Sequence, residues 1–272
     1  MFKVLTVNVN GIRATKKNGG IAWLEEADVD VICLQEVRAT HEQLHEALAD
    51  SQFANWHVSH SPASALGRSG VAVLSREQPS AVRIGFNSEE FDHQGRWIEV
   101  DLTSPLGSLT VLSVYVPTGD ADKPEKQAEK YRFLDAMDLR LAGLAKRAKR
   151  NKSNVVVTGD LNVGHRELDI KNWKGNRNKS GFLEDERAHF DVWFAKDVWV
   201  DLHRRFVGEV EGPYTWWSWR GKAFDNDAGW RIDYILATAG LSSNCVKVEV
   251  GRAPSYDTRW SDHAPVTATF AP

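Results

Sequence analysis

Polar side chains that can bind a metal or move a proton stand beside three apolar segments of this chain. Glu36 ends VDVICLQE, Asp160 and Asn162 end NVVVTGDLN, and the pair Asp262–His263 comes just before the last apolar run. Carboxylates at the ends of buried strands lose hydration, which a structure tolerates where a cation or a proton transfer uses them. Clustered carboxylate and amide oxygens with an imidazole suit a hard divalent cation beside a phosphate ester. We therefore expect the hydrolysis of a phosphate ester.

Three further residues extend this set. Asp233 interrupts the apolar run WRIDYIL, where an unpaired carboxylate would be costly, and His263 is its natural cationic partner. Asn8 and Asn10 follow the first apolar run, as Glu36 follows the second. Ordinary turn formation is the alternative explanation for an Asn or Asp in such places, so each residue alone leaves both readings open.

Apolar runs between Gly, Pro and Ser turns predict many short strands, which must position these side chains. We expect strands at residues 2–9, 30–35, 53–60, 70–75, 80–86, 96–102, 108–116, 154–160, 214–219, 231–237, 245–250 and 264–270. Helical spacing predicts helices at 19–27, 40–49, 123–150 and 183–195, with Thr40 as a possible N-cap. This order favours a four-layer α/β sandwich, two packed and mostly antiparallel β-sheets flanked by helices, with residues 1–272 as a single domain.

Composition narrows the class of protein. The 272 residues are 42% hydrophobic and 26% charged, which is typical of a globular protein, and the net charge is −3. This charge argues against nucleic-acid binding, but a local basic groove needs only a few Lys and Arg. Cys33 and Cys245 make neither a disulfide framework nor a zinc site. No apolar stretch approaches the ~20 residues that span a bilayer. We expect a monomer in the cytoplasm.

Nine segments of the chain, in order, resemble the exonuclease III family of abasic-site DNA endonucleases, within the endonuclease/exonuclease/phosphatase superfamily. They are NVNGIRA (8–14), LQEVR (34–38), GRWIEV (95–100), SVYVPTG (113–119), GDLNV (159–163), DIKNWKGNRNKSGF (169–182), YTWWSWR (214–220), GWRIDYIL (229–236) and SDHAP (261–265). The resemblance implies a nuclease that uses Mg²⁺, with Mn²⁺ as an alternative. It implies cleavage of duplex DNA on the 5′ side of abasic sites, 3′→5′ exonuclease activity and trimming of blocked 3′ ends. A place at the nucleoid, through this substrate, would follow.

The resemblance also implies a role for each site residue. Glu36 would be the principal metal ligand, helped by Asn8 and Asp262. Asp160 would position or deprotonate the attacking water, which Asn162 would orient, and both, with His263, are further candidate metal ligands. Tyr115 would face the scissile group, and His263, held by Asp233, would bind the phosphate.

A loop at residues 163–181 points to DNA as the substrate. It interleaves cations, amides and one aromatic residue, a composition suited to a DNA backbone: Lys171, Trp173, Lys174, Asn176 and Arg177. The resemblance adds Asn10 and Arg13 as DNA contacts, and places Trp216, with Trp217 beside it, at the pocket for the flipped abasic sugar. A solvated loop is the alternative for the first group, and a core position is the alternative for either Trp.

Two other functions stay open. A related phosphodiesterase or phosphatase could act on another phosphate ester, and a DNA-binding protein could have lost catalysis. The chain also departs from common family patterns at Asn10, Thr118 and Trp219, which leaves the balance between the activities undetermined. The cation run Lys146, Arg147, Lys149, Arg150 and Lys152 we interpret as a solvated helix C-terminus.

Overall fold

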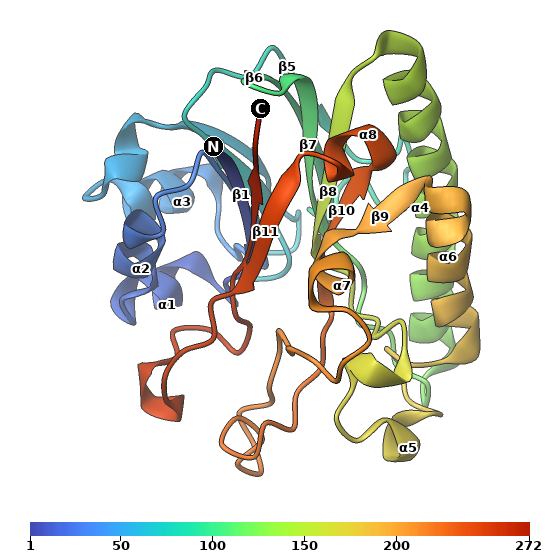
Figure 1. Ribbon diagram of the computed structural model, residues 1–272. Coiled ribbons are helices and arrows are strands. Elements are labelled where there is room, and N and C mark those ends of the chain that lie inside the picture. The colour runs from blue at the N-terminus through green and yellow to red at the C-terminus, as the bar shows by residue number, and fades with distance from the viewer.

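Two six-stranded sheets pack face to face between two layers of helices in the computed structural model, which describes residues 1–272 apart from the side chain of residue 197 (Figure 1). The first sheet has the order β11 (Cys245–Val250), β12 (Val266–Phe270), β1 (Phe2–Asn8), β2 (Val31–Gln35), β4 (Val71–Ser75) and β3 (His57–Ser61). The second has the order β5 (Ala81–Ile84), β6 (Trp97–Ser104), β7 (Gly107–Tyr115), β8 (Asn154–Asp160), β10 (Asp233–Thr238) and β9 (Trp199–Asp201).

The two sheets share one pattern of strand pairing. A single adjacent pair in each sheet is parallel, β1 with β2 and β7 with β8, and the other adjacent pairs are antiparallel. Phe2 pairs with Phe270, so the two termini lie together at one end of the sandwich. The carboxyl ends of the parallel strands lie at the other end, where ligands commonly bind in α/β proteins.

Helices cover the outer face of each sheet. The first sheet is covered by α1 (Ile12–Lys17), α2 (Gly20–Glu26) and α3 (His41–Leu48), and the second by α4 (Pro124–Asn151) and α6 (Glu184–Phe194). Shorter elements lie in the connections: α5 (Trp173–Asn176), α7 (Leu202–Val207), α8 (Ala239–Ser242) and the 3₁₀ turns η1 (Gln52–Asn55), η2 (Glu167–Asp169), η3 (Ala195–Asp197) and η4 (Tyr256–Thr258). No helix in the described part of the chain could cross a membrane.

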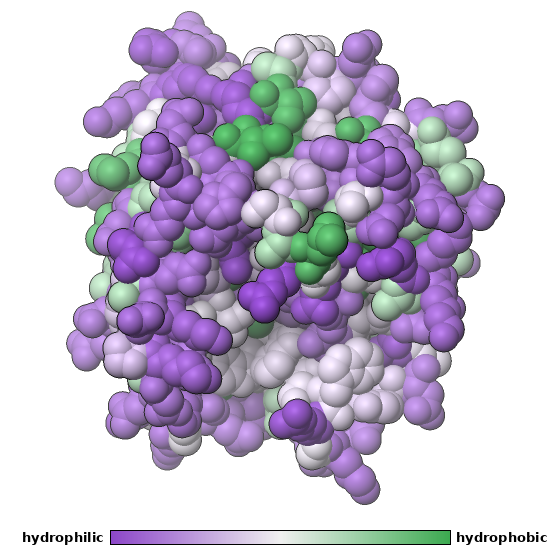
Figure 2. Space-filling model, turned by 180° about the vertical axis from the view of Figure 1, so that it is seen from behind, coloured by the Kyte–Doolittle hydropathy of each residue, from purple (hydrophilic) through white to green (hydrophobic). Residues whose placement is uncertain are grey.

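Apolar side chains fill all three spaces between the four layers. Val4, Val73, Val111, Val156 and Ile235 belong to the cluster between the sheets, and separate clusters lie under each helical layer. Because the central strands are covered on both faces, β2 and β4 are continuous buried runs instead of alternating ones. On the face shown in Figure 2 the surface is mainly hydrophilic, and its hydrophobic areas are small and separate.

The predicted four-layer sandwich is confirmed, and so are the four predicted helices. Thr40 caps α3 as expected, in a capping box with Gln43. The strand predicted at residues 214–219 is wrong: Trp216 forms only isolated bridges, to Trp230 and to His263. Residues 53–55 belong to a 3₁₀ turn instead of the predicted strand.

Candidate active site

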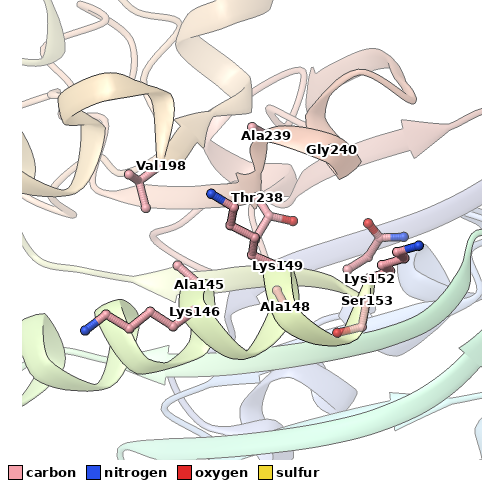
Figure 3. Close-up of a pocket in the computed structure, with 11 residues that line it drawn as sticks. Ala145, Lys146, Ala148, Lys149, Lys152, Ser153, Val198, Thr238, Ala239 and Gly240 are labelled. Carbon is pink, nitrogen blue, oxygen red and sulfur yellow. The ribbon is translucent and has the colours of Figure 1, made fainter.

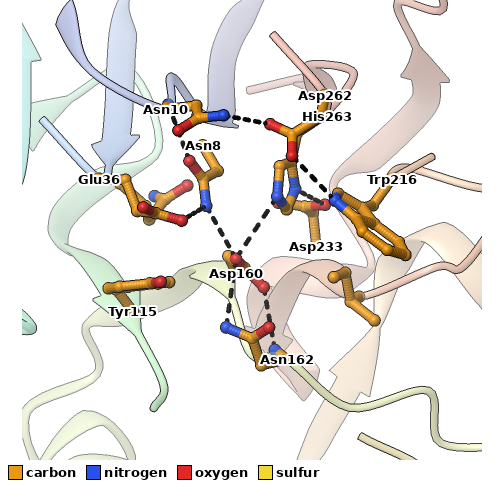
Figure 4. A network of polar contacts seen from close by, with 12 residues as sticks. Asn8, Asn10, Glu36, Tyr115, Asp160, Asn162, Trp216, Asp233, Asp262 and His263 are labelled. Carbon is orange, nitrogen blue, oxygen red and sulfur yellow. Dashed lines mark hydrogen bonds and ion pairs between the residues drawn. The ribbon is translucent and has the colours of Figure 1, made fainter. Parts of the chain in front are cut away.

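Polar residues from both sheets meet at the carboxyl ends of the two parallel pairs (Figure 4). Asn8 ends β1, and Glu36 directly follows β2. Tyr115 and Asp160 end β7 and β8 and are paired with each other in the register. Asp233 begins β10 directly opposite Asp160. The two sheets thus deliver all five side chains to one place.

Asn8 connects the carboxylates of the two sheets. Its amide nitrogen donates to Glu36 Oε1 at 2.8 Å and to Asp160 Oδ2 at 2.9 Å. The second oxygen of Glu36 pairs with Arg38 Nη2. Because these contacts leave lone pairs free on both carboxylates, the oxygens can still bind a cation.

His263 is held between two aspartates. Its Nδ1 donates to Asp233 Oδ2 at 2.8 Å, while Nε2 lies 3.7 Å from Asp160 Oδ2. Thr215 fixes Asp233 by donating its hydroxyl to the same Oδ2 at 2.6 Å. The imidazole therefore presents Nε2 toward the cavity in a fixed orientation.

Asp262 stands at the rim between an amide and an indole. Its Oδ1 accepts from Asn10 Nδ2 at 2.9 Å, and its Oδ2 accepts from Trp216 Nε1 at 3.2 Å. The carboxylate is thereby joined to the first strand and to the loop that carries Trp216 (Figure 4).

Four residues in and beside the site have a left-handed backbone. Asn10, Glu36, Arg38 and Asn162 have φ values of 48°, 49°, 51° and 50°, in the left-handed region that costs non-glycine residues on the order of 1 kcal/mol each. Gly159, with φ 147°, has no room for a side chain, because a Cβ there would lie 1.9 Å from the carbonyl oxygen of Val114. This close approach to β7 sets the position of Asp160.

Burial and charge shift the pKa values of the central groups. Burial raises the pKa of Asp160, with the charge of Asp233 adding to the effect and that of His263 opposing it, to about 7. Burial alone would lower the pKa of His263, but Asp233 and then Asp160 raise it to about 10. Burial, followed by the charges of Glu36 and Asp160, raises the pKa of Tyr115, so its phenol stays protonated.

These groups line a cavity of about 360 Å³. Its lining combines acidic and aromatic side chains and includes Glu36, Tyr115, Thr118, Asp160, Asn162, Lys179, Ser180, Trp216, Trp230, Ile232, Asp262 and His263. The rings of Trp216 and Trp230 meet edge to face with centroids 6.2 Å apart. The cavity joins a charged reaction centre to an apolar recess.

The donor atoms suit a hard divalent cation. Asp160, Asp233 and His263 each offer a ligand atom within 4.8 Å of the others, and Glu36 lies on the opposite side of Asn8. Asp233 Oδ1 is buried without a partner in the described part of the chain. A cation would offset the burial, and the smaller repulsion from Asp233, that raise the pKa of Asp160, since carboxylate oxygens are the ligands Mg²⁺ and Mn²⁺ prefer.

The residues expected to contact DNA have different surroundings. Lys171 pairs with Glu211 at 2.6 Å, and Arg177 and Lys174 lie over the ring of Trp173 at 4.4 and 5.6 Å. These residues lie on and beside α5. Asn176 donates to the carbonyl of Asn172, and Arg13, exposed on α1, lines another cavity beside Arg68.

The expectation for Trp217 needs correction. Its ring is only 1% exposed and packs against Phe224, and its Nε1 donates to Asp227 at 3.0 Å. A residue with these contacts belongs to the interior. In the run YTWWSWR, Trp216 faces the cavity and Trp217 the core, as alternation along an extended segment requires.

A larger cavity of about 580 Å³ lies at the other end of the second sheet (Figure 3). It is formed by the last turns of α4, the start of β8 and the end of β10, with Lys146, Lys149 and Lys152 at its edge. These lysines are exposed at the helix C-terminus, where cations complement the helix dipole. The cavity has none of the active-site residues in its lining.

Several residues of the site were missed from the sequence. Arg38 stands two residues after Glu36 in LQEVR and forms an ion pair with it. Thr215 stands in YTWWSWR, and only the folded chain brings it to Asp233. Trp230 forms the aromatic wall with Trp216. Lys130 was missed as well, although its position was unusual. It is a charged residue on the apolar stripe of α4, three and four residues before Phe133 and Leu134.

A four-layer sandwich with this acidic and imidazole cluster defines a phosphodiester hydrolase of the exonuclease III type. The family described as "Endonuclease/Exonuclease/phosphatase family" matches residues 5–263, and the chain belongs to it. Enzymes of the exonuclease III type depend on a metal.

Known proteins support this membership along the whole chain. An exodeoxyribonuclease of Bacillus subtilis is 35% identical over 97% of this chain and 98% of its own. The structure of an AP endonuclease from Archaeoglobus fulgidus superposes with a TM-score of 0.83, at 30% identity, covering 99% of both chains. The 3′ phosphatase NExo from Neisseria, bound to a product DNA hairpin, gives a TM-score of 0.84 at 27% identity over 100% of both chains.

Proposed function

We propose that this chain is a Mg²⁺-dependent DNA repair nuclease that hydrolyses the phosphodiester on the 5′ side of abasic sites in duplex DNA. It would also remove nucleotides in the 3′→5′ direction and trim blocked 3′ ends. The observation that carries this proposal is the cavity in which Glu36, Asp160 and His263 face Trp216 and Trp230. Residues 1–272 would act as one catalytic domain and as a monomer, at the nucleoid through its substrate.

Each polar side chain of the site has one task in the reaction. Asp160 accepts the proton of the attacking water, and Asn162, fixed to Asp160 and to the Val116 carbonyl, orients that water. His263, kept cationic by Asp233, binds a phosphate oxygen. The protonated phenol of Tyr115 donates a hydrogen bond to the scissile group.

Glu36, with Asn8 and Asp262, would hold the metal, and Asp160 and Asn162 are the candidates for a second ion. His263 could join them only as a neutral imidazole, because the imidazolium that binds phosphate has no free lone pair. When bound, Mg²⁺ or Mn²⁺ supplies positive charge that stabilises the phosphoryl oxygens and the leaving group. Asn8 positions the two carboxylates, because its amide donates to Glu36 in its own sheet and to Asp160 in the other.

The aromatic recess suits a sugar that has lost its base. Trp216, Trp230 and Ile232 form a small apolar wall beside the acidic centre. An abasic nucleotide leaves the helix more easily than an intact one because no base has to be unstacked. Trp173, covered by Lys174 and Arg177, gives the neighbouring loop a cationic surface for the phosphate backbone.

Product analysis on a duplex with one abasic analogue tests this function. We expect a single cut on the 5′ side of the analogue, abolished by EDTA and restored by Mg²⁺, with little cleavage of inositol phosphates or sphingomyelin. Preference for those esters would instead favour the related phosphodiesterase. Tight DNA binding without cleavage at any metal concentration would favour a protein that has lost catalysis.

A further inference from the structure

Lys130 lies on the buried stripe of α4 and reaches beneath the active-site cavity. Its side chain is 0% exposed, in line with Phe133, Leu134 and Met137. A lysine in such a place loses the hydration of its ammonium group and needs strong partners in return. Burial lowers the pKa of Lys130, and the carboxylate of Glu186 opposes this shift.

The partners of Lys130 come from the loops that line the cavity. Its Nζ donates to the carbonyl oxygens of Asn162 at 2.9 Å and Thr118 at 3.2 Å and to Ser180 Oγ at 3.4 Å, and it pairs with Glu186 Oε1 at 2.7 Å. Thr118, Asn162 and Ser180 all line the active-site cavity. One ammonium group therefore joins three separate parts of the cavity wall.

Glu186, on α6, forms the ion pair with Lys130 and also binds the loop after α5. Its Oε2 accepts from the backbone nitrogens of Gly181 at 2.7 Å and Leu183 at 3.0 Å, and its Oε1 accepts from Ser180 Oγ at 3.1 Å. Gly119 allows this packing, since a Cβ there would lie 2.5 Å from Ser180 Oγ and 2.8 Å from Lys130 Cδ. The ion pair fixes the loop after α5 as well as the loop after β7.

Lys130 contacts Asn162 at a point where the backbone is left-handed. The φ of Asn162, 50°, lies in the left-handed region, which Asn enters more readily than most non-glycine residues but still at a cost. The N–H donates to Asp160 Oδ1 at 3.0 Å, the side-chain amide donates to Val116 O at 2.9 Å, and the carbonyl oxygen is held by Lys130. Lys130 supplies the contact on the carbonyl side.

We propose that Lys130, paired with Glu186, is a positioning residue that holds Asn162 in place to orient the attacking water. The inference rests on the proposed function, because Asn162 is assigned there to the attacking water. Lys130 itself lies behind the cavity wall and touches no substrate, so its effect on the reaction passes through the backbone of Asn162.

A double-mutant cycle between Lys130 and Asn162 tests the inference. Lys130→Met, Asn162→Ala and the double variant are compared with wild type for kcat and KM on the abasic-analogue duplex, and for binding of that duplex in EDTA. Lys126→Met is the matched control, because Lys126 is exposed one helical turn earlier on α4. Thermal unfolding monitors the fold of each variant.

We expect Lys130→Met to lower kcat by about 100-fold in the wild-type background, since small misplacements of a catalytic group have effects of this size. In the Asn162→Ala background the loss should shrink to less than about threefold, because the residue through which Lys130 acts is gone. KM and binding in EDTA should change little, and Lys126→Met should match wild type.

Equal losses in both backgrounds, or no loss at all, would overturn the inference. If Lys130→Met fails to fold because Glu186 is left as a buried unpaired charge, the cycle is run with Lys130→Met combined with Glu186→Gln. Unfolding of that variant as well would show that the pair serves the fold only. If wild type does not cleave the abasic duplex, the proposed function is wrong. If wild type is active but the losses of the two single variants simply add, only the role of Lys130 is wrong.

Discussion

Asn8 in the first sheet and Asp160 in the second are joined by a hydrogen bond of 2.9 Å, although 152 positions separate them in the sequence. The same amide reaches Glu36 at 2.8 Å. The interface between the sheets is therefore closed, at its reactive end, by polar groups instead of apolar ones.

Asp160→Asn should remove most turnover and keep the binding of abasic DNA. The amide retains the shape of the side chain but cannot take a proton from water. We expect kcat to fall by at least about 100-fold, with the dissociation constant for the abasic duplex in EDTA within a few-fold of wild type. Single-turnover kinetics and fluorescence anisotropy measure the two quantities. Near-normal turnover would remove Asp160 from the mechanism.

Glu36→Gln should raise the Mg²⁺ concentration needed for half-maximal activity by about tenfold or more, because a ligand carboxylate becomes neutral. Activity is measured over a Mg²⁺ titration. Glu125→Gln, a change at an exposed position in the first turn of α4, serves as the control. An unchanged titration curve would contradict the role of Glu36 as a metal ligand.

Asp233→Asn should lower kcat and move the alkaline limb of its pH profile to lower pH. Asp233 is the main charge that raises the pKa of His263 to about 10, so its loss leaves less imidazolium at neutral pH. We expect a loss of about 100-fold in kcat near pH 8, the size typical of general acid–base groups. A pH profile of unchanged shape would show that the charge on His263 is not used.

Lys174→Ala should reduce the salt dependence of DNA binding. Removing one phosphate contact lowers the slope of log affinity against log salt by about one. Lys146→Ala, at the far end of the sandwich, should leave the slope unchanged. Binding is measured in EDTA from low to moderate salt. Equal slopes for wild type and both variants would show that the loop around α5 is a solvated surface and does not contact the phosphates.

His203→Gln should make the protein less sensitive to acid. Burial, followed by the charge of Arg231, lowers the pKa of His203 from 6.5 to about 4. Between these pH values the unfolded chain binds a proton that the folded protein does not, so wild type loses stability as the pH falls from 6.5 toward 4.

Urea unfolding at pH 7.5 and pH 4.5 measures this effect. The free energy of unfolding of wild type should fall more than that of His203→Gln, by on the order of 2 kcal/mol. His57→Gln, at an exposed position of β3, should lose as much stability as wild type. If His203→Gln loses as much stability as wild type, the lowered pKa of His203 is not the cause of the acid sensitivity.

Strands and helices with strong periodic patterns could be predicted from the sequence. The runs that became β1, β2, β7 and β8 are apolar because both faces of each strand are covered, and the ends of three of them indicated the positions of Asn8, Glu36 and Asp160. Tyr115 was expected inside its strand, and only the family resemblance pointed to it. Short elements could not be predicted in this way. The helix α1 spans only Ile12–Lys17 and has no side-chain cap.

Long-range partners were beyond local patterns. The aromatic run at residues 214–219 alternates like a strand, yet it is held by single bridges to Trp230 and His263. The role of Thr215 depends on Asp233, which lies 18 positions further along the chain and meets it only in the folded protein. The stacking of the two sheets, which creates the site, depends on contacts of this kind.

Crystals of the protein with an uncleavable abasic-analogue duplex and Mn²⁺, examined by anomalous scattering, test the central claim most directly. We predict Mn²⁺ bound to Glu36, with the phosphodiester on the 5′ side of the analogue between Asp160 and His263 and the sugar against Trp216. Mn²⁺ at the separate group of Asp135, Asp138 and His189 only, or DNA bound away from this cavity, would contradict the account.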